Sequence, residues 1–135
     1  MKIIIKIITL LGILFFCTIL FNSPTNAAST DDSCERLILS VLTPNINVQI
    51  EDYYRDKLIY PPTFASYLGG NILKFKYFDS HIDAVVTVIP YVGPHIAVGK
   101  DKIKFRISNT EQIIVESYEH ITDYKLSPNW IHIKR

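Results

Sequence analysis

The stretch from Lys102 to Ile107, KIKFRI, decides the fold class of this chain of 135 residues. Basic and apolar side chains alternate in it at every position, and a period of two residues places the two kinds on opposite faces of an extended strand. Such a strand packs one face on a core and leaves the other in water. We therefore expect an antiparallel sheet with one covered face.

Three further segments have strand patterns. Residues 71–77 alternate apolar residues with lysines, and residues 113–118 form another apolar run after a polar turn. Residues 83–92 are rich in Val, Thr and Ile, and Pro90 near the end of this run fits an edge or a bulge. Residues 130–133 either add a short last strand or cover the sheet. Together these segments predict an antiparallel meander of four to five strands.

A helix is predicted before the strands. Asp32 with Glu35 three residues later fits a capping box. The apolar residues that follow recur at steps of three and four, which is typical of one helical face; they are Cys34, Leu37, Ile38, Val41 and Leu42. Pro44 either begins a second helix or kinks a single one, and the spacing continues beyond it to Tyr54. Residues 55–70 have two Pro, two Gly and no sustained period, and we expect a loop there.

The predicted fold class is therefore α+β, in which an N-terminal helix or kinked helix pair packs on one face of the meander sheet. Cys34 is the only cysteine after residue 27, so no internal disulfide is possible in that part of the chain. Its position on the apolar helical face predicts a buried small side chain, and a mixed disulfide with a partner is the alternative.

The first 27 residues have the layout of a secretory signal peptide. Lys2 and Lys6 flank an apolar run that ends at Phe21, and polar residues then lead to Ala27 and Ala28. We expect cleavage near these alanines, which leaves residues 28–135 as a single domain that is secreted or held in the extracytoplasmic envelope. The alternative is an uncleaved anchor, although the run is short for a spanning helix of about 20 residues.

The charge of residues 28–135 excludes a general attraction to nucleic acid, since 12 basic residues stand against 13 acidic ones. The strand quoted above nevertheless has a basic stripe on one face, which Lys74 and Lys76 extend; its members are Lys100, Lys102, Lys104 and Arg106. Anionic wall polymers, a lipid surface or another envelope protein are the partners that this stripe fits. A solvated sheet face without a ligand is the alternative.

A second candidate site is the loop before this strand, because glycines and a proline hold its histidine at a fixed angle. The residues of this candidate binding loop are Tyr91, Gly93, Pro94, His95, Gly99 and Asp101. Asp101 is near enough in sequence to orient the His95 ring. His81 lies between two aspartates in a predicted turn, which does not fix three ligands in one place, so no metal site is predicted.

Two groups of residues resemble a known family. They are Leu42-Thr43-Pro44-Asn45-Ile46 with Ile50-Glu51-Asp52-Tyr53-Tyr54, and Gly93-Pro94-His95 with Gly99, Asp101, Ile103 and Phe105. Over residues 37–118 the chain resembles the small exported bacterial proteins known as domain of unknown function 3888. The resemblance implies export and a helix-plus-sheet body. It supplies no catalytic residue.

These observations favour a non-enzymatic binding module without a cofactor. The sequence has no nucleophile elbow, no close-spaced pair of metal ligands and no phosphate-binding glycine loop. The alternative is a small hydrolase or metal-dependent enzyme that uses His95 and Asp101, with His120 as a further candidate, in a pocket under residues 61–70.

Overall fold

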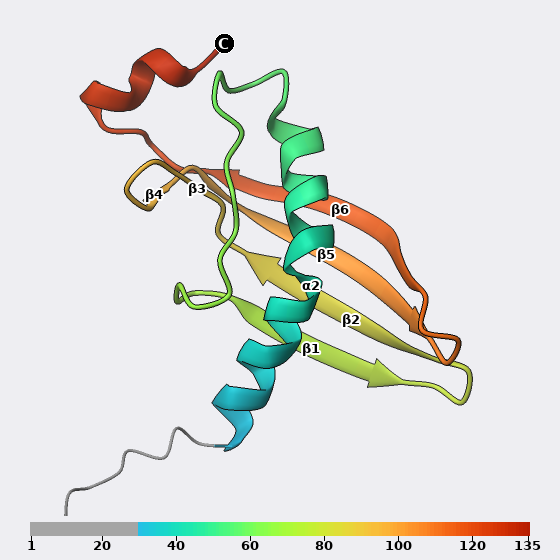
Figure 1. Ribbon diagram of the computed structural model, residues 1–135. Helices are drawn as coiled ribbons and strands as arrows, with labels where there is room; N and C mark the ends of the chain where they lie inside the picture. The colour runs from blue at the N-terminus through green and yellow to red at the C-terminus, as the bar shows by residue number, and fades with distance from the viewer. Residues whose placement is uncertain (1–29) are drawn as a thin grey trace, which may run out of the picture. The chain divides into compact units, whose positions relative to one another are not determined.

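The core of the computed structural model is a four-stranded antiparallel sheet with the strand order β1-β2-β5-β6 (Figure 1). The strands are β1 (Ile72–Tyr77), β2 (His81–Val88), β5 (Gly99–Ser108) and β6 (Ile113–Asp123). A single helix, α2 (Thr30–Tyr54), crosses one face of this sheet (Figure 1). The predicted α+β class, with an N-terminal helix on an antiparallel sheet, is confirmed.

The structure describes residues Thr30–Arg135, and Asp31–Arg135 form one compact unit. The predicted signal peptide and its cleavage site lie outside the described residues. Within residues 30–135, no helix is long and apolar enough to cross a membrane.

The connection between β2 and β5 forms a small ribbon of its own. The predicted strand 83–92 ends at Val88, and Pro90 separates it from β3 (Tyr91–Val92), which pairs with β4 (Ile96–Ala97). Pro90 has no N–H to donate to a sheet, which suits the break between the two strands. At the end of the chain, the 3-10 helix η1 (Pro128–Ile133) buries Ile133 completely, so the tail covers the core and adds no strand.

Strand register separates two faces of the sheet. Leu73, Val86, Ile103 and Tyr118 lie opposite one another on neighbouring strands and face α2. Residues one position away along each strand face the other side. We call that side the open face, because its lysine and arginine side chains are half-buried or exposed and no helix covers them within residues 30–135.

The buried face of α2 differs from the predicted one in its first half. The side chains that pack on the sheet are Leu39, Leu42, Ile46, Ile50 and Tyr54. Leu37 and Val41 are 64% and 60% exposed, and Cys34 is exposed as well, so the prediction that these three face the core was wrong. Apolar residues occupy two opposite sides of this helix, and the sheet packs on the side that continues without interruption past Pro44.

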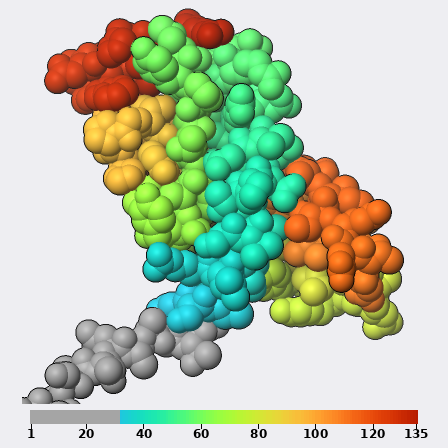
Figure 2. All heavy atoms as spheres, in the orientation of Figure 1, coloured from blue at the N-terminus to red at the C-terminus, as the bar shows by residue number. Residues whose placement is uncertain are grey.

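The outer side of α2 is uncovered over most of its length in the space-filling view (Figure 2).

The first residue of α2 also differs from the prediction. The helix begins at Thr30, before the predicted cap Asp32. The Oε1 atom of Glu35 accepts a hydrogen bond from the Leu73 N–H of β1 at 3.2 Å. This contact ties the helix to the edge of the sheet.

Candidate functional site

A buried pair of a carboxyl group and an imidazole lies between the sheet and the last turn of α2. Asp101 of β5 is fully buried, and the His120 Nδ1 atom of β6 lies 2.6 Å from its Oδ1 atom. The two residues are direct partners in the β5–β6 register. Just beyond them, a bulge adds Ile121 to β6. His120 lies on the helix-facing side because it is two residues from Tyr118 in an unshifted register, and beyond the bulge Asp123 lies near the other ring nitrogen, with Nε2 to Oδ1 at 3.3 Å.

Three tyrosines surround this pair. The Tyr54 hydroxyl lies 3.4 Å from His120 Nδ1, and the Tyr53 ring stacks on the imidazole with 4.8 Å between centroids. Tyr118 packs against Tyr53 at 5.2 Å. The Asp101 carboxyl is close enough to raise the pKa of Tyr118, but the Tyr118 hydroxyl forms no hydrogen bond of good geometry within residues 30–135. The cluster therefore joins the C-terminal end of α2 to β5 and β6.

Burial dominates the electrostatics of the cluster. It raises the pKa of the Asp101 carboxyl above its ordinary value, and the hydrogen bond with His120 acts in the opposite direction. The pKa values of Tyr54 and Tyr118 are raised as well, first by burial and then by the nearby Asp101 charge. The phenols therefore stay protonated at neutral pH and serve as packing and hydrogen-bonding groups.

The His120 ring is enclosed between two carboxyl groups. Both ring nitrogens of His120 face carboxylates, Asp101 on one side and Asp123 on the other. The ring is 17% exposed, and the Nε2 atom is buried. A general base needs a nitrogen directed at substrate, so the geometry is that of a structural bridge.

The predicted pair of His95 and Asp101 is not formed. Asp101 is buried against His120, whereas the His95 side chain is exposed and lies edge-on to Tyr91 and Tyr67, with ring centroids 5.1 and 6.5 Å away. The reason is the phase of β5: Asp101 lies on the same side of the strand as Ile103, which faces the core.

The candidate binding loop is a tight turn. His95 has a φ of 61°, and its N–H donates to the Gly93 carbonyl at 2.8 Å. Gly93 has a φ of 49°, and a Cβ at this position would lie 2.3 Å from the Trp130 ring. Pro94 is exposed between them. The glycine thus lets η1 pack closely on the turn.

The basic stripe lies on the open face, where its members alternate with buried residues of β5. Much of its charge is paired with carboxylates of neighbouring strands. Lys102 pairs with Glu119. Lys104 contacts Asp83 at 2.9 Å and Glu116 at 2.6 Å.

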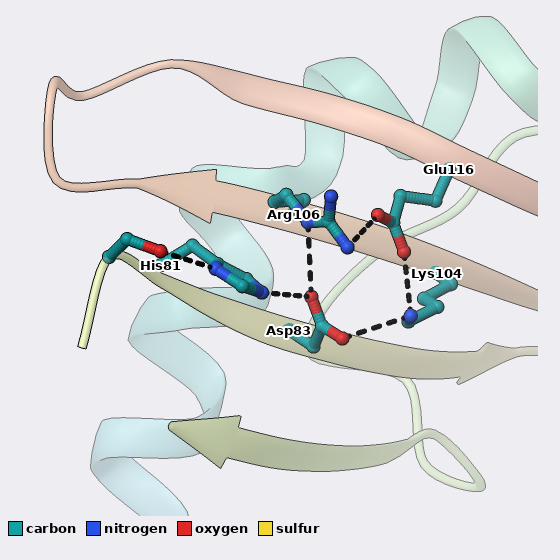
Figure 3. Close-up of polar contacts among 6 residues, drawn as sticks. His81, Asp83, Lys104, Arg106 and Glu116 are labelled. Atoms are coloured by element: carbon teal, nitrogen blue, oxygen red, sulfur yellow. Dashed lines mark hydrogen bonds and ion pairs between the residues drawn. The ribbon is translucent and has the colours of Figure 1, made fainter. Parts of the chain in front are cut away.

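Arg106 completes a network on this face, which Figure 3 shows on the side of the sheet turned away from α2. Its guanidinium lies 2.5 Å from Glu116 and 3.5 Å from Asp83, and His81 lies 3.4 Å from the same Asp83 atom. Glu116 is the extra residue of a second β6 bulge, which directs its carboxylate between Lys104 and Arg106.

The network shifts two pKa values. The hydrogen bond from Lys104 holds the pKa of Asp83 below its ordinary value, and burial opposes this effect in part. Hydrogen bonds with Glu116 and Asp83 raise the pKa of Lys104. Both groups are therefore charged at neutral pH, and the centre of the open face is close to neutral. Among residues 30–135, no group of three or more His, Cys, Asp and Glu side chains could hold a metal ion.

A family model described as Protein of unknown function (DUF3888) matches residues 34–122. The chain belongs to this family. The match confirms the resemblance inferred from the sequence, and it covers most of α2 and the whole sheet up to Thr122. No curated protein and no solved structure shows significant similarity to the chain.

Two partners in this DUF3888 chain are not predicted by the sequence pattern. The pattern groups His120 with His95 rather than with Asp101 alone, and it assigns no role to Glu116. One signal was available for the first: Asp101 shares the alternation phase of Ile103 and Phe105, so the strand pattern itself marks a buried carboxylate. The position of Glu116 depends on a bulge, for which the sequence contains no clear sign.

Proposed function

We propose that this DUF3888 chain is an exported, non-enzymatic binding module that engages an anionic partner through the open face of its sheet. The envelope or the medium is its place of action. We assign a structural role to the buried Asp101–His120 cluster, because it joins the end of α2 to β5 and β6 and both ring nitrogens lie near carboxylates.

The charge balance of the open face carries the proposal. Six cationic side chains lie there against three carboxylates: Lys74, Lys76, Lys100, Lys102, Lys104 and Arg106 against Asp83, Glu116 and Glu119. The carboxylates are all engaged by Lys102, Lys104 and Arg106. The excess positive charge therefore rests on Lys74, Lys76 and Lys100, in a chain whose residues 28–135 are slightly acidic as a whole.

Charge reversal on β1 tests the binding site. The double variant Lys74→Glu and Lys76→Glu is expected to lose at least about tenfold in affinity for polyphosphate or phosphatidylglycerol vesicles, because exposed cations supply long-range attraction. Affinity of the unaltered protein should fall steeply as salt rises from 50 to about 300 mM, where the Debye length shortens to below about 10 Å. Co-sedimentation or calorimetry measures both effects.

The matched control is Lys125→Glu with Lys134→Glu, which makes the same charge change at exposed positions outside the open face. It should leave most of the affinity in place. Equal losses in the two double variants would mean that only net charge matters, and the open face would then not be the site. Binding that does not respond to salt would also contradict the proposal.

Export is tested by fractionating the native host into cytosol, membrane, wall and medium. We expect the protein outside the cytosol, with a mature N-terminus near Ala27 or Ala28 on sequencing. A membrane-bound product that retains Met1 would favour the uncleaved anchor. Full-length protein in the cytosol would refute export.

A further inference from the structure

We infer that the free edge of β1 takes up an extended segment of a partner protein, with alternating acidic and apolar residues, as a fifth strand of the sheet. The inference rests on the proposed function, because it names the partner that the excess charge of the open face attracts. Three features of β1 support it: outward backbone groups, a groove lined in part by apolar side chains on one face, and on the other face two lysines that have no carboxylate partner within residues 30–135.

The backbone groups of every second residue in β1 point away from β2. Phe78 N–H donates to the His81 carbonyl at 2.9 Å, so this pair at the hairpin end is hydrogen-bonded. Hydrogen-bonded and non-hydrogen-bonded pairs alternate in an antiparallel ladder. Leu73, Phe75 and Tyr77 are therefore the residues with outward groups, and the bond from Leu73 N–H to Glu35 instead of β2 agrees with this assignment.

A groove of about 300 Å³ runs between β1 and the first half of α2. The side chains of Ile38, Leu73 and Phe75 line it together with Cys34, Glu35 and Tyr77, so apolar surface alternates with polar groups. Every second side chain of an added strand would point to this side of the sheet. Apolar side chains of moderate size fit there, and their burial contributes to affinity in the usual mode of strand addition.

The other side chains of the added strand would lie on the open face beside Lys74 and Lys76. Neither lysine has a carboxylate partner within residues 30–135; Lys76 lies over the Phe78 ring, with Nζ 4.9 Å from its centroid. The nearest acidic residue across the strand is Asp83, which Lys104 and Arg106 already engage. Cross-strand pairs of opposite charge are favourable, so acidic residues suit these positions.

The opposite edge of the sheet is less suited to such a partner. The β5–β6 ladder contains two register shifts, whereas the β1–β2 ladder runs from Ile72 to Tyr77 without one. Bulges twist an edge away from further pairing. A second copy of this chain is also a poor occupant of β1, because pairing of two β1 edges would bring four lysines together.

The experiment uses the full chain and three blocked six-residue peptides: alternating glutamate and valine, the same residues in two blocks, and alternating lysine and valine. We expect the alternating acidic peptide to bind at least about tenfold more tightly than the other two. Its binding should slow hydrogen exchange at the Phe75 and Tyr77 amides, which face the free edge, by at least about tenfold.

Tyr77→Pro separates strand addition from simple charge attraction. Tyr77 is 73% exposed, and its N–H is not part of the ladder with β2, so proline there removes only an outward donor. We expect this variant to lose about tenfold in affinity for the alternating acidic peptide. The control Tyr77→Ala also loses the ring that lines the groove but retains the N–H, so it should bind at least about threefold more tightly than Tyr77→Pro. Circular dichroism and exchange at the β2 amides check that the sheet is intact.

The outcomes distinguish the two proposals. If the block peptide binds as well as the alternating one, or the Phe75 and Tyr77 amides gain no protection, strand addition is wrong, although the anionic site can still stand on the Lys74 and Lys76 result. Binding to phosphatidylglycerol vesicles but to no peptide would make lipid the partner. If both amides are already protected without peptide, another segment of the chain occupies the edge, and the inference fails. No binding to any anionic probe would remove the proposed function as well.

Discussion

Replacing Gly99 with alanine is expected to lower the free energy of unfolding by about 3 kcal/mol, which is the upper end of the usual cost of overpacking. A Cβ atom at Gly99 would lie 2.5 Å from the Tyr54 hydroxyl and 2.8 Å from the Thr122 carbonyl oxygen. The second of these is a backbone atom of the neighbouring strand, which cannot rotate away. The strand pair must therefore separate, or Tyr54 must leave its contact with His120.

Urea denaturation followed by tyrosine fluorescence measures this effect. The matched control is Gly69→Ala, because a Cβ at Gly69 would have nothing within 4 Å. The control is expected to be neutral, or to stabilise by about 0.5 kcal/mol through the lower entropy of the unfolded chain. If Gly99→Ala lowers the free energy of unfolding by less than about 1 kcal/mol, the contact between β5 and the end of α2 is looser than these two short distances indicate.

Two substitutions of Asp101 are expected to have opposite effects on stability: one removes only the charge, and the other removes the whole side-chain carboxyl group. Burial raises its pKa in the folded protein above the ordinary value of 3.8. Deprotonation of Asp101 therefore lowers the free energy of unfolding. The stability that the protonated carboxyl contributes is fully present below the unfolded-state pKa and is lost as pH rises through the folded-state pKa. Asp101→Asn removes the charge and retains an acceptor for His120, so at pH 7 this variant should be as stable as the unaltered protein or up to about 1 kcal/mol more stable.

Removing the side chain should have the reverse result. Asp101→Ala leaves the His120 Nδ1 atom without the carboxylate and opens a small cavity, and we expect a loss of about 2–3 kcal/mol at pH 7. The control Asp79→Ala alters an exposed turn residue and should change stability by less than about 0.5 kcal/mol.

Denaturation curves of Asp101→Asn from pH 3 to pH 8 test the sign of the charge effect. The advantage of the asparagine variant should shrink as pH falls, because the unaltered carboxyl then takes up a proton. An Asp101→Asn variant that loses as much stability as Asp101→Ala would mean that the ionised carboxylate itself stabilises the fold.

Local sequence predicted the strands well because a strand that is covered on one side has a strong pattern. Residues 99–108 form the strand that the alternation around Ile103 and Phe105 indicates. The hairpin between β1 and β2 turns at Asp79 and Ser80 as predicted, but His81, which was also expected in the turn, is the first residue of β2. The buried side of the helix was harder to predict than the strands. Leu37 and Leu42 both satisfy helical spacing, but they lie on different sides of α2, and only packing on the sheet selects the side that includes Leu42.

The candidate sites depended still more on distant residues. Asp101 and His120 are 19 residues apart and meet through the β5–β6 register, and Glu116 reaches Arg106 through a bulge. His95 is closer to Asp101 in sequence, which made it the natural candidate partner. The strand phase directs Asp101 into the core instead, away from that exposed loop.

The sequence by itself determined the elements of this protein: the alternation of KIKFRI, the glycine and proline breaks, and an apolar helix before the sheet. These are local properties, since backbone period and turn preference act over a few residues. Only the tertiary structure decided which side of α2 is buried and which carboxylate each basic residue meets; within residues 30–135 it also leaves Lys74 and Lys76, on the edge strand β1, without a carboxylate partner. Those outcomes depend on register and on packing between segments far apart in the chain, and a one-residue shift of register would reverse them.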